Sequence, residues 1–165
     1  TRHMVDSYAR KSDAYALAQI VSGATTAAVG TLPSGVGSAI GKIVRGALRV
    51  INADALPSFA IVATDVFEEL AFTKKDDVLA YLDLALGLEE GTLESFRIVP
   101  NAGMAAAGTV LVGAKEAATV LELPGSPIRV NALDLVKGGY DEALFGYIAV
   151  KVDYPTGLQL VTPNP

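Results

Sequence analysis

Residues 35–42, GVGSAIGK, come closer than any other segment of this sequence to a phosphate-binding loop. Glycines at the start of a helix let backbone N–H groups approach anionic oxygens. A Walker A loop, however, needs a glycine where this chain has Val36 and a hydroxyl residue where it has Ile43. The dinucleotide fingerprint also fails, because it follows a strand and the segment before these glycines is predicted to be helical. The glycines therefore indicate a flexible hinge, and we predict no cofactor.

Three pairs of neighbouring carboxylates could share acid–base chemistry if burial separated their pKa values. They are Glu68–Glu69, Asp76–Asp77 and Glu89–Glu90. Each pair lies near a predicted helix end or in a polar turn, where solvated charge is the usual role of such residues. The pattern favours that role over catalysis. A small enzyme with a carboxylate or lysine site stays open as an alternative.

The serine nucleophile candidates have no partner for the usual chemistry. Ser22, Ser34 and Ser126 do not lie in a Gly-x-Ser-x-Gly elbow. The single histidine, His3, falls in residues 1–4, which resemble a cloning remnant. A Ser–Lys dyad stays open but has no positive support. The chain has no cysteine, and residues 134–141 lack EF-hand spacing, so we predict no catalytic and no metal-binding residues.

Lys42, Arg45 and Arg49 form a basic stripe on one side of a predicted helix. Such a stripe is most often the solvated face of the helix, although contact with nucleic acid or with the acids of a neighbouring subunit stays open. The formal net charge of −5 argues against a domain whose main task is to hold phosphate backbones. We therefore expect only indirect contact with DNA.

The elements that would carry these residues are helical in the first half of the chain. A helix is expected over residues 6–28 and a glycine-rich loop over 30–41. Apolar residues at steps of three and four predict an amphipathic helix over 40–51, which stops before Pro57. A short buried strand follows over 59–64, and two helices over 64–72 and 74–86.

The second half of the chain reads as strands separated by Gly, Pro and Asn. They are expected at residues 96–100, 109–113, 120–123, 128–131, 144–154 and 158–161. Helices followed by strands predict an α+β fold. The longest apolar stretches fall short of the roughly 20 residues that a membrane-spanning helix needs. Apolar residues make up 51% of the chain and charged residues 19%, which favours burial of surface between copies.

The pattern of elements resembles the major capsid proteins of tailed phages. The resemblance rests on the helix around residues 12–14, the glycine-rich loop, and the amphipathic helix leading into ALPSFAIV at 55–62. It continues through RIVP at 97–100, GTVLVGAKEA at 108–117 and DEALFGY at 141–147 with the strand after it. It implies the phage major capsid fold, a mixed sheet flanked by helices.

That resemblance also implies a division of the chain. Residues 5–27 would be the end of a helix of the peripheral domain, 28–140 the axial domain, and 141–165 the return strands of the peripheral domain. Members of the family normally carry an N-terminal arm, an extended loop and most of a long spine helix before this region. The chain is therefore expected to be a piece of a longer protein.

The implied function is structural: a subunit of an icosahedral phage or prophage capsid that joins copies of itself in pentamers and hexamers enclosing DNA. It would be found in the virion, and in the host cytoplasm during assembly. It would not be an enzyme and would bind no small-molecule substrate and no membrane. The alternatives are an encapsulin-like compartment shell, a small enzyme, and an interaction domain that binds one protein partner.

Overall fold

The computed structural model describes residues 2–72, 96–104, 106–134 and 138–164. The helices are α1 (Arg2–Gly23), α2 (Ser38–Asn52) and α3 (Thr64–Phe72), with 3-10 turns η2 (Lys115–Ala117) and η3 (Pro155–Gly157). The strands are β1 (Thr25–Ala28), β2 (Phe59–Val62), β3 (Arg97–Pro100), β4 (Val110–Gly113), β5 (Ala118–Glu122), β6 (Ile128–Asp134), β7 (Gly139–Phe145), β8 (Ile148–Val152) and β9 (Leu158–Thr162). The fold is α+β, as predicted.

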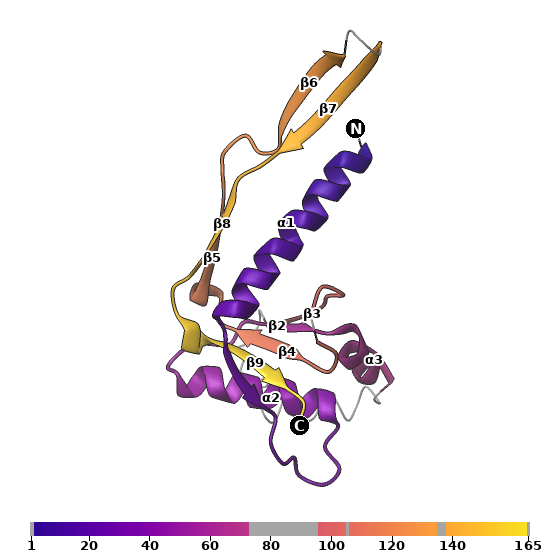
Figure 1. The fold of residues 1–165 in the computed structure, drawn as a ribbon. Coiled ribbons are helices and arrows are strands. Elements are labelled where there is room, and N and C mark those ends of the chain that lie inside the picture. The colour runs from indigo at the N-terminus through magenta and orange to yellow at the C-terminus, as the bar shows by residue number, and fades with distance from the viewer. Residues whose placement is uncertain (1, 73–95, 105, 135–137, 165) are drawn as a thin grey trace.

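A mixed five-stranded sheet forms the base of the molecule, in the order β1-β9-β4-β2-β3 (Figure 1). The central strand β4 runs antiparallel to both of its neighbours, β9 and β2, and the edge strands β1 and β3 each run parallel to the strand beside them. Strand β9 comes from the end of the described chain and β1 from near its beginning. The sheet therefore joins segments that are far apart in the sequence.

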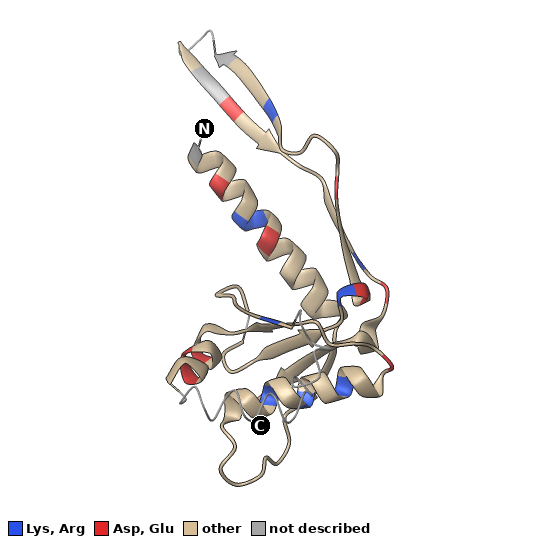
Figure 2. Ribbon diagram, turned by 180° about the vertical axis from the view of Figure 1, so that it is seen from behind, with Lys and Arg blue, Asp and Glu red and all other residues tan. Residues whose placement is uncertain are grey.

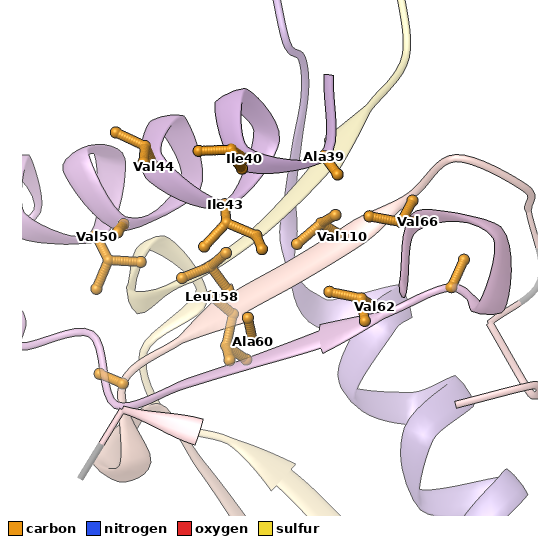
Figure 3. Close-up of a cluster of buried hydrophobic side chains, with 14 of the residues drawn as sticks. Ala39, Ile40, Ile43, Val44, Val50, Ala60, Val62, Val66, Val110 and Leu158 are labelled. Atoms are coloured by element: carbon orange, nitrogen blue, oxygen red, sulfur yellow. The ribbon is translucent and has the colours of Figure 1, made fainter. Parts of the chain in front are cut away.

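Helix α2 packs across this sheet and supplies six of the fifteen buried residues of the core cluster (Figure 3). Ile43, Ala47 and Val50 are fully buried against strand residues such as Val62 and Val112. Gly46 permits the close approach, because a Cβ at this position would lie 2.5 Å from a methyl carbon of Val112. The predicted amphipathic helix is thus confirmed, and its apolar stripe is the face that meets the sheet.

A long arm rises from the base and is built from two consecutive two-stranded ribbons (Figure 1). Strands β5 and β8 form the lower ribbon, and β6 and β7 form a hairpin beyond it. Helix α1 runs along one side of the arm and contacts β8 and β7. The arm is therefore a two-layer structure, with helix on one side of a ribbon.

Two sequence predictions fail at identifiable residues. Residues 25–28 are strand β1 and not helix, since α1 ends at Gly23 and the two threonines after it pair with β9. Residues 144–154 are not one strand: β7 ends at Phe145 and β8 begins at Ile148. The helix expected over 74–86 lies outside the described residues.

Candidate assembly surface

The start of α2, where a phosphate would have to bind, is occupied by a carboxylate of the chain itself. Oε1 of Glu69, from α3, accepts a hydrogen bond from the backbone N–H of Ala39 at 3.0 Å. Negative charge at a helix N-terminus is stabilising. Glu69 therefore acts as a capping group between α3 and α2. The other two acidic pairs lie outside the described residues.

Figure 2 shows the basic positions along α2 in blue, and two of them, Arg45 and Arg49, bind the chain's own backbone. Arg49 donates to the carbonyls of Ala27 and Ala28, at 3.3 and 2.7 Å, and Arg45 donates to the carbonyl of Thr31. Lys42 is buried. The expectation of a solvated face is therefore wrong, because these arginines hold β1 and the following loop against α2.

The serine candidates are not assembled into a catalytic group in the described part of the chain. Ser22 donates its hydroxyl to the carbonyl of Gln19 within α1. His3 lies in α1 and lines an open depression beside Ser7, Lys11 and Leu144. Across residues 2–72, 96–104, 106–134 and 138–164, no group of three or more His, Cys, Asp or Glu side chains could hold a metal ion. None of the helices described has the length and hydropathy to cross a lipid bilayer.

The feature that stands out instead is the arm, which α1 holds on one side only. The Tyr8 hydroxyl donates to Oε1 of Glu122 at 2.8 Å. The same Tyr8 side chain lies where a Cβ of Gly146 would be, at the break between β7 and β8. Nearer the sheet, Gly23 at the end of α1 lies against Val152, because a Cβ at position 23 would come within 2.7 Å of a methyl carbon of that valine. Glu122, Gly146 and Val152 therefore mark the inner side of the arm.

Large apolar side chains occupy the opposite side, which we call the outer face. Its large apolar side chains are those of Leu121, Leu123, Ile128, Val130, Phe145 and Tyr147. Their exposed fractions run from 42% to 69%. Lys151, the neighbour of the inward-facing Val152 in β8, lies on the same side. An open depression of about 300 Å³ lies at the junction of the two ribbons. It is lined by Leu121, Leu123, Pro124, Tyr147 and Ala149, and Glu122 borders it as well. The arrangement can bind an apolar surface and offers no reacting group.

Sequence reasoning missed this face because it read residues 144–154 as one strand. The break was marked by Gly146 on one strand and by the Pro-Gly-Ser-Pro run at 124–127 on the other. These four residues stand between β5 and β6, opposite the short break between β7 and β8.

The fold, a mixed sheet crossed by one helix with a helix-backed arm, is the phage capsid-type fold. A chain of Mycobacterium phage Che8 matches 97% of this chain with a TM-score of 0.72 and 19% sequence identity. The virus-like particle from Pyrococcus furiosus matches 90% with a TM-score of 0.62 and 13% identity. A phage-related protein from Bordetella bronchiseptica matches 86% with a TM-score of 0.55 and 10% identity.

These likenesses confirm the fold that the sequence pattern predicted. The matched part covers 61%, 60% and 56% of the three structures, so the chain spans less than two thirds of their length. No family model and no curated protein matches the sequence. With sequence identities of 10–19%, these matches show a shared fold.

Proposed function

We propose that the chain is a structural subunit of an icosahedral phage or prophage capsid. It assembles with copies of itself into pentamers and hexamers that enclose DNA. The observation that carries the proposal is the match to the Mycobacterium phage Che8 chain over 97% of this chain. The subunit works by forming contacts and turns over no substrate. Its place is the virion, after assembly in the host cytoplasm.

The division of the subunit into an axial and a peripheral part is also a proposal. The predicted boundary at residue 140 would put β9 with the peripheral strands, whereas β9 pairs with β1 and β4 in the five-stranded sheet. We therefore propose that the sheet and α2 form the axial part, and that α1 and the arm form the peripheral part. Rings close when a head-to-tail interface rotates back onto itself, and many small contacts in a shell add up.

A compartment shell is the second candidate, since the chain also has the fold of the virus-like particle from Pyrococcus furiosus. Both kinds of shell would assemble through repeated contacts between copies, and they differ in what the shell encloses. Nuclease-resistant DNA inside native particles supports the capsid. A co-purifying cargo enzyme with no packaged DNA supports the compartment.

The proposal is tested by expressing the complete reading frame that contains this chain. The purified product is imaged by negative-stain electron microscopy over a range of concentrations and salt levels. Closed shells, or free rings of five and six subunits, are the expected result. A small monomer that persists at every concentration would contradict both shell candidates.

A further inference from the structure

We propose that Tyr154 is a lock at the root of the arm: its hydroxyl holds the arm at one angle to the base, and without that hydroxyl the arm tilts. The root is the segment 153–157, which leads from β8 through η3 into β9. The base is the five-stranded sheet together with α2 and α3. This lock goes beyond the shell function and would operate in a single copy of the chain. Two features support it: the attachment of Tyr154 on both sides of the joint, and the geometry of the bonds that remain without it.

The hydroxyl of Tyr154 caps the end of α2. The last carbonyls of a helix have no partner within the helix. The N–H groups of Asp54 and Ala55 satisfy two of them, and Asp54 has the positive φ, 57°, that is typical of this kind of helix ending. The carbonyl of Ala53 accepts its bond from Tyr154, 101 residues further along the chain. The root of the arm therefore supplies part of the cap of α2.

The rest of Tyr154 is fixed within the root. Its backbone N–H donates to the carbonyl of Ala117 at 3.2 Å, and its own carbonyl accepts from the N–H of Gly157 at 3.0 Å. Its ring lies against Gly157, where an added Cβ would come within 2.7 Å of a ring carbon. Figure 1 shows the root beside the end of α2. Because its main chain and ring are both held, the hydroxyl ties the position of β8 to that of α2.

The backbone bonds at the joint hold the two strands of the arm together and leave one rotation free. The N–H of Ala114 donates to the carbonyl of Gly157, which continues the pairing of β4 with β9. The N–H of Asp153 donates to the carbonyl of Ala117, which continues the pairing of β5 with β8. These bonds stay intact if the ribbon turns as a flap about the line where it leaves the sheet. Only a contact with an element outside the ribbon resists that rotation.

Helix α1 is one such contact and Tyr154 is the other. Gly23 at the end of α1 lies against Val152, and the chain then enters β1, where the Thr25 hydroxyl donates to the carbonyl of Pro155 at 3.1 Å. This tie holds the arm to the β1 edge, whereas Tyr154 holds it to the end of α2. Tyr154 is 41% exposed. Water can replace an exposed hydrogen bond at little net cost, so the lock can open without unfolding the base.

The test follows the angle of the arm through one distance. The chain has no cysteine, so spin labels can be attached to Glu68→Cys in α3 and Leu121→Cys in β5, which replace exposed side chains. Position 121 lies between the root and the break between the two ribbons, so movement of the hairpin is not recorded. Double electron–electron resonance on dissociated protein gives the distribution of this distance. Tyr154→Phe keeps the ring and removes only the hydroxyl, and it should make the distribution at least twice as wide.

Two comparisons make the result specific to the lock. Tyr15→Phe removes an exposed phenolic hydroxyl from α1 and should leave the distribution unchanged. With Tyr154 intact, the distribution should be as narrow as that of a label pair within the base, Leu48→Cys with Glu68→Cys. This second comparison does not depend on whether Tyr154→Phe folds. Circular dichroism at the temperature of the measurement checks that each protein is folded.

The outcomes separate the lock from the proposed function. An unchanged distribution in Tyr154→Phe would overturn the lock, and so would equal broadening by Tyr15→Phe. With Tyr154 intact, a distribution much wider than that of the pair within the base would overturn it too, because the arm would then move despite the bond. Since all of these measurements use dissociated protein, a wild-type protein that forms no shell or ring would contradict the proposed function and leave the lock standing.

Discussion

At the scale of single residues, Gly146 is one of the places where α1 meets the arm. Tyr8 fills the space that any side chain at 146 would need, and its hydroxyl is bonded to Glu122 across the other strand. One aromatic ring therefore contacts both strands at the junction of the two ribbons. This contact therefore ties α1 to the junction, in addition to the contact of Gly23 with Val152 lower on the arm.

We expect Gly146→Ala to displace the Tyr8 ring and to break its hydrogen bond to Glu122. Overpacking of this kind costs about 1–3 kcal/mol, measured as the loss in free energy of unfolding by urea denaturation. The double variant Tyr8→Ala/Gly146→Ala should be more stable than the sum of the two single effects predicts, since Tyr8→Ala makes room for the methyl group. If the losses of the two single variants simply add in the double variant, Tyr8 and Gly146 are not in contact.

The pKa of Asp153 is lowered by a hydrogen bond and ion pair from Lys151, with help from the Thr119 hydroxyl. A lowered carboxyl pKa contributes stability above the pKa of the unfolded chain, and the contribution disappears as pH falls through the folded pKa. Lys151→Met should raise the Asp153 pKa, as measured by NMR titration of the carboxyl carbon. An unchanged pKa in that variant would show that Lys151 is not the cause.

At the scale of elements, one edge strand of the sheet is held in place by a side chain. Arg49 of α2 binds two carbonyls of edge strand β1, which is four residues long. Short edges with occupied carbonyls resist pairing with other chains. The same arginine thus holds the edge strand β1 against α2.

Arg49→Ala should lower the free energy of unfolding by roughly 1.5–3 kcal/mol, the range for hydrogen bonds to a charged group. It should also increase aggregation at partial denaturation, measured by light scattering. Arg10→Ala, which removes an exposed arginine from α1, serves as the control and should change neither quantity. If Arg49→Ala and Arg10→Ala have the same free energy of unfolding and aggregate equally, the hydrogen bonds of Arg49 do not stabilise the fold.

The elements also show which features could be predicted from sequence. Helix α2 was predictable because its apolar residues recur within the helix itself, and Pro57 marks its end. The role of Arg49 could not be predicted, because its partners at 27 and 28 belong to β1. Strand β1 forms only by pairing with β9, which lies more than 130 residues further along the chain. The outer face depends in the same way on the register of β5 with β8 and on one glycine.

At the scale of the whole molecule, the net charge of −5 opposes the approach of many copies. Raising salt from about 0.1 to about 1 M shortens the screening length from ~10 to ~3 Å and leaves apolar contacts intact. The concentration needed for assembly should therefore fall several-fold with salt, as measured by light scattering. Shells that dissolve as salt rises would show that ion pairs hold the copies together.

The central claim, that the chain is a shell subunit, is tested most directly by a cryo-electron microscopy reconstruction of particles from the complete reading frame. We predict an icosahedral shell whose five-fold and six-fold rings contain the five-stranded sheet and α2. An open filament, or density in which this fold lies outside the shell wall, would contradict the claim.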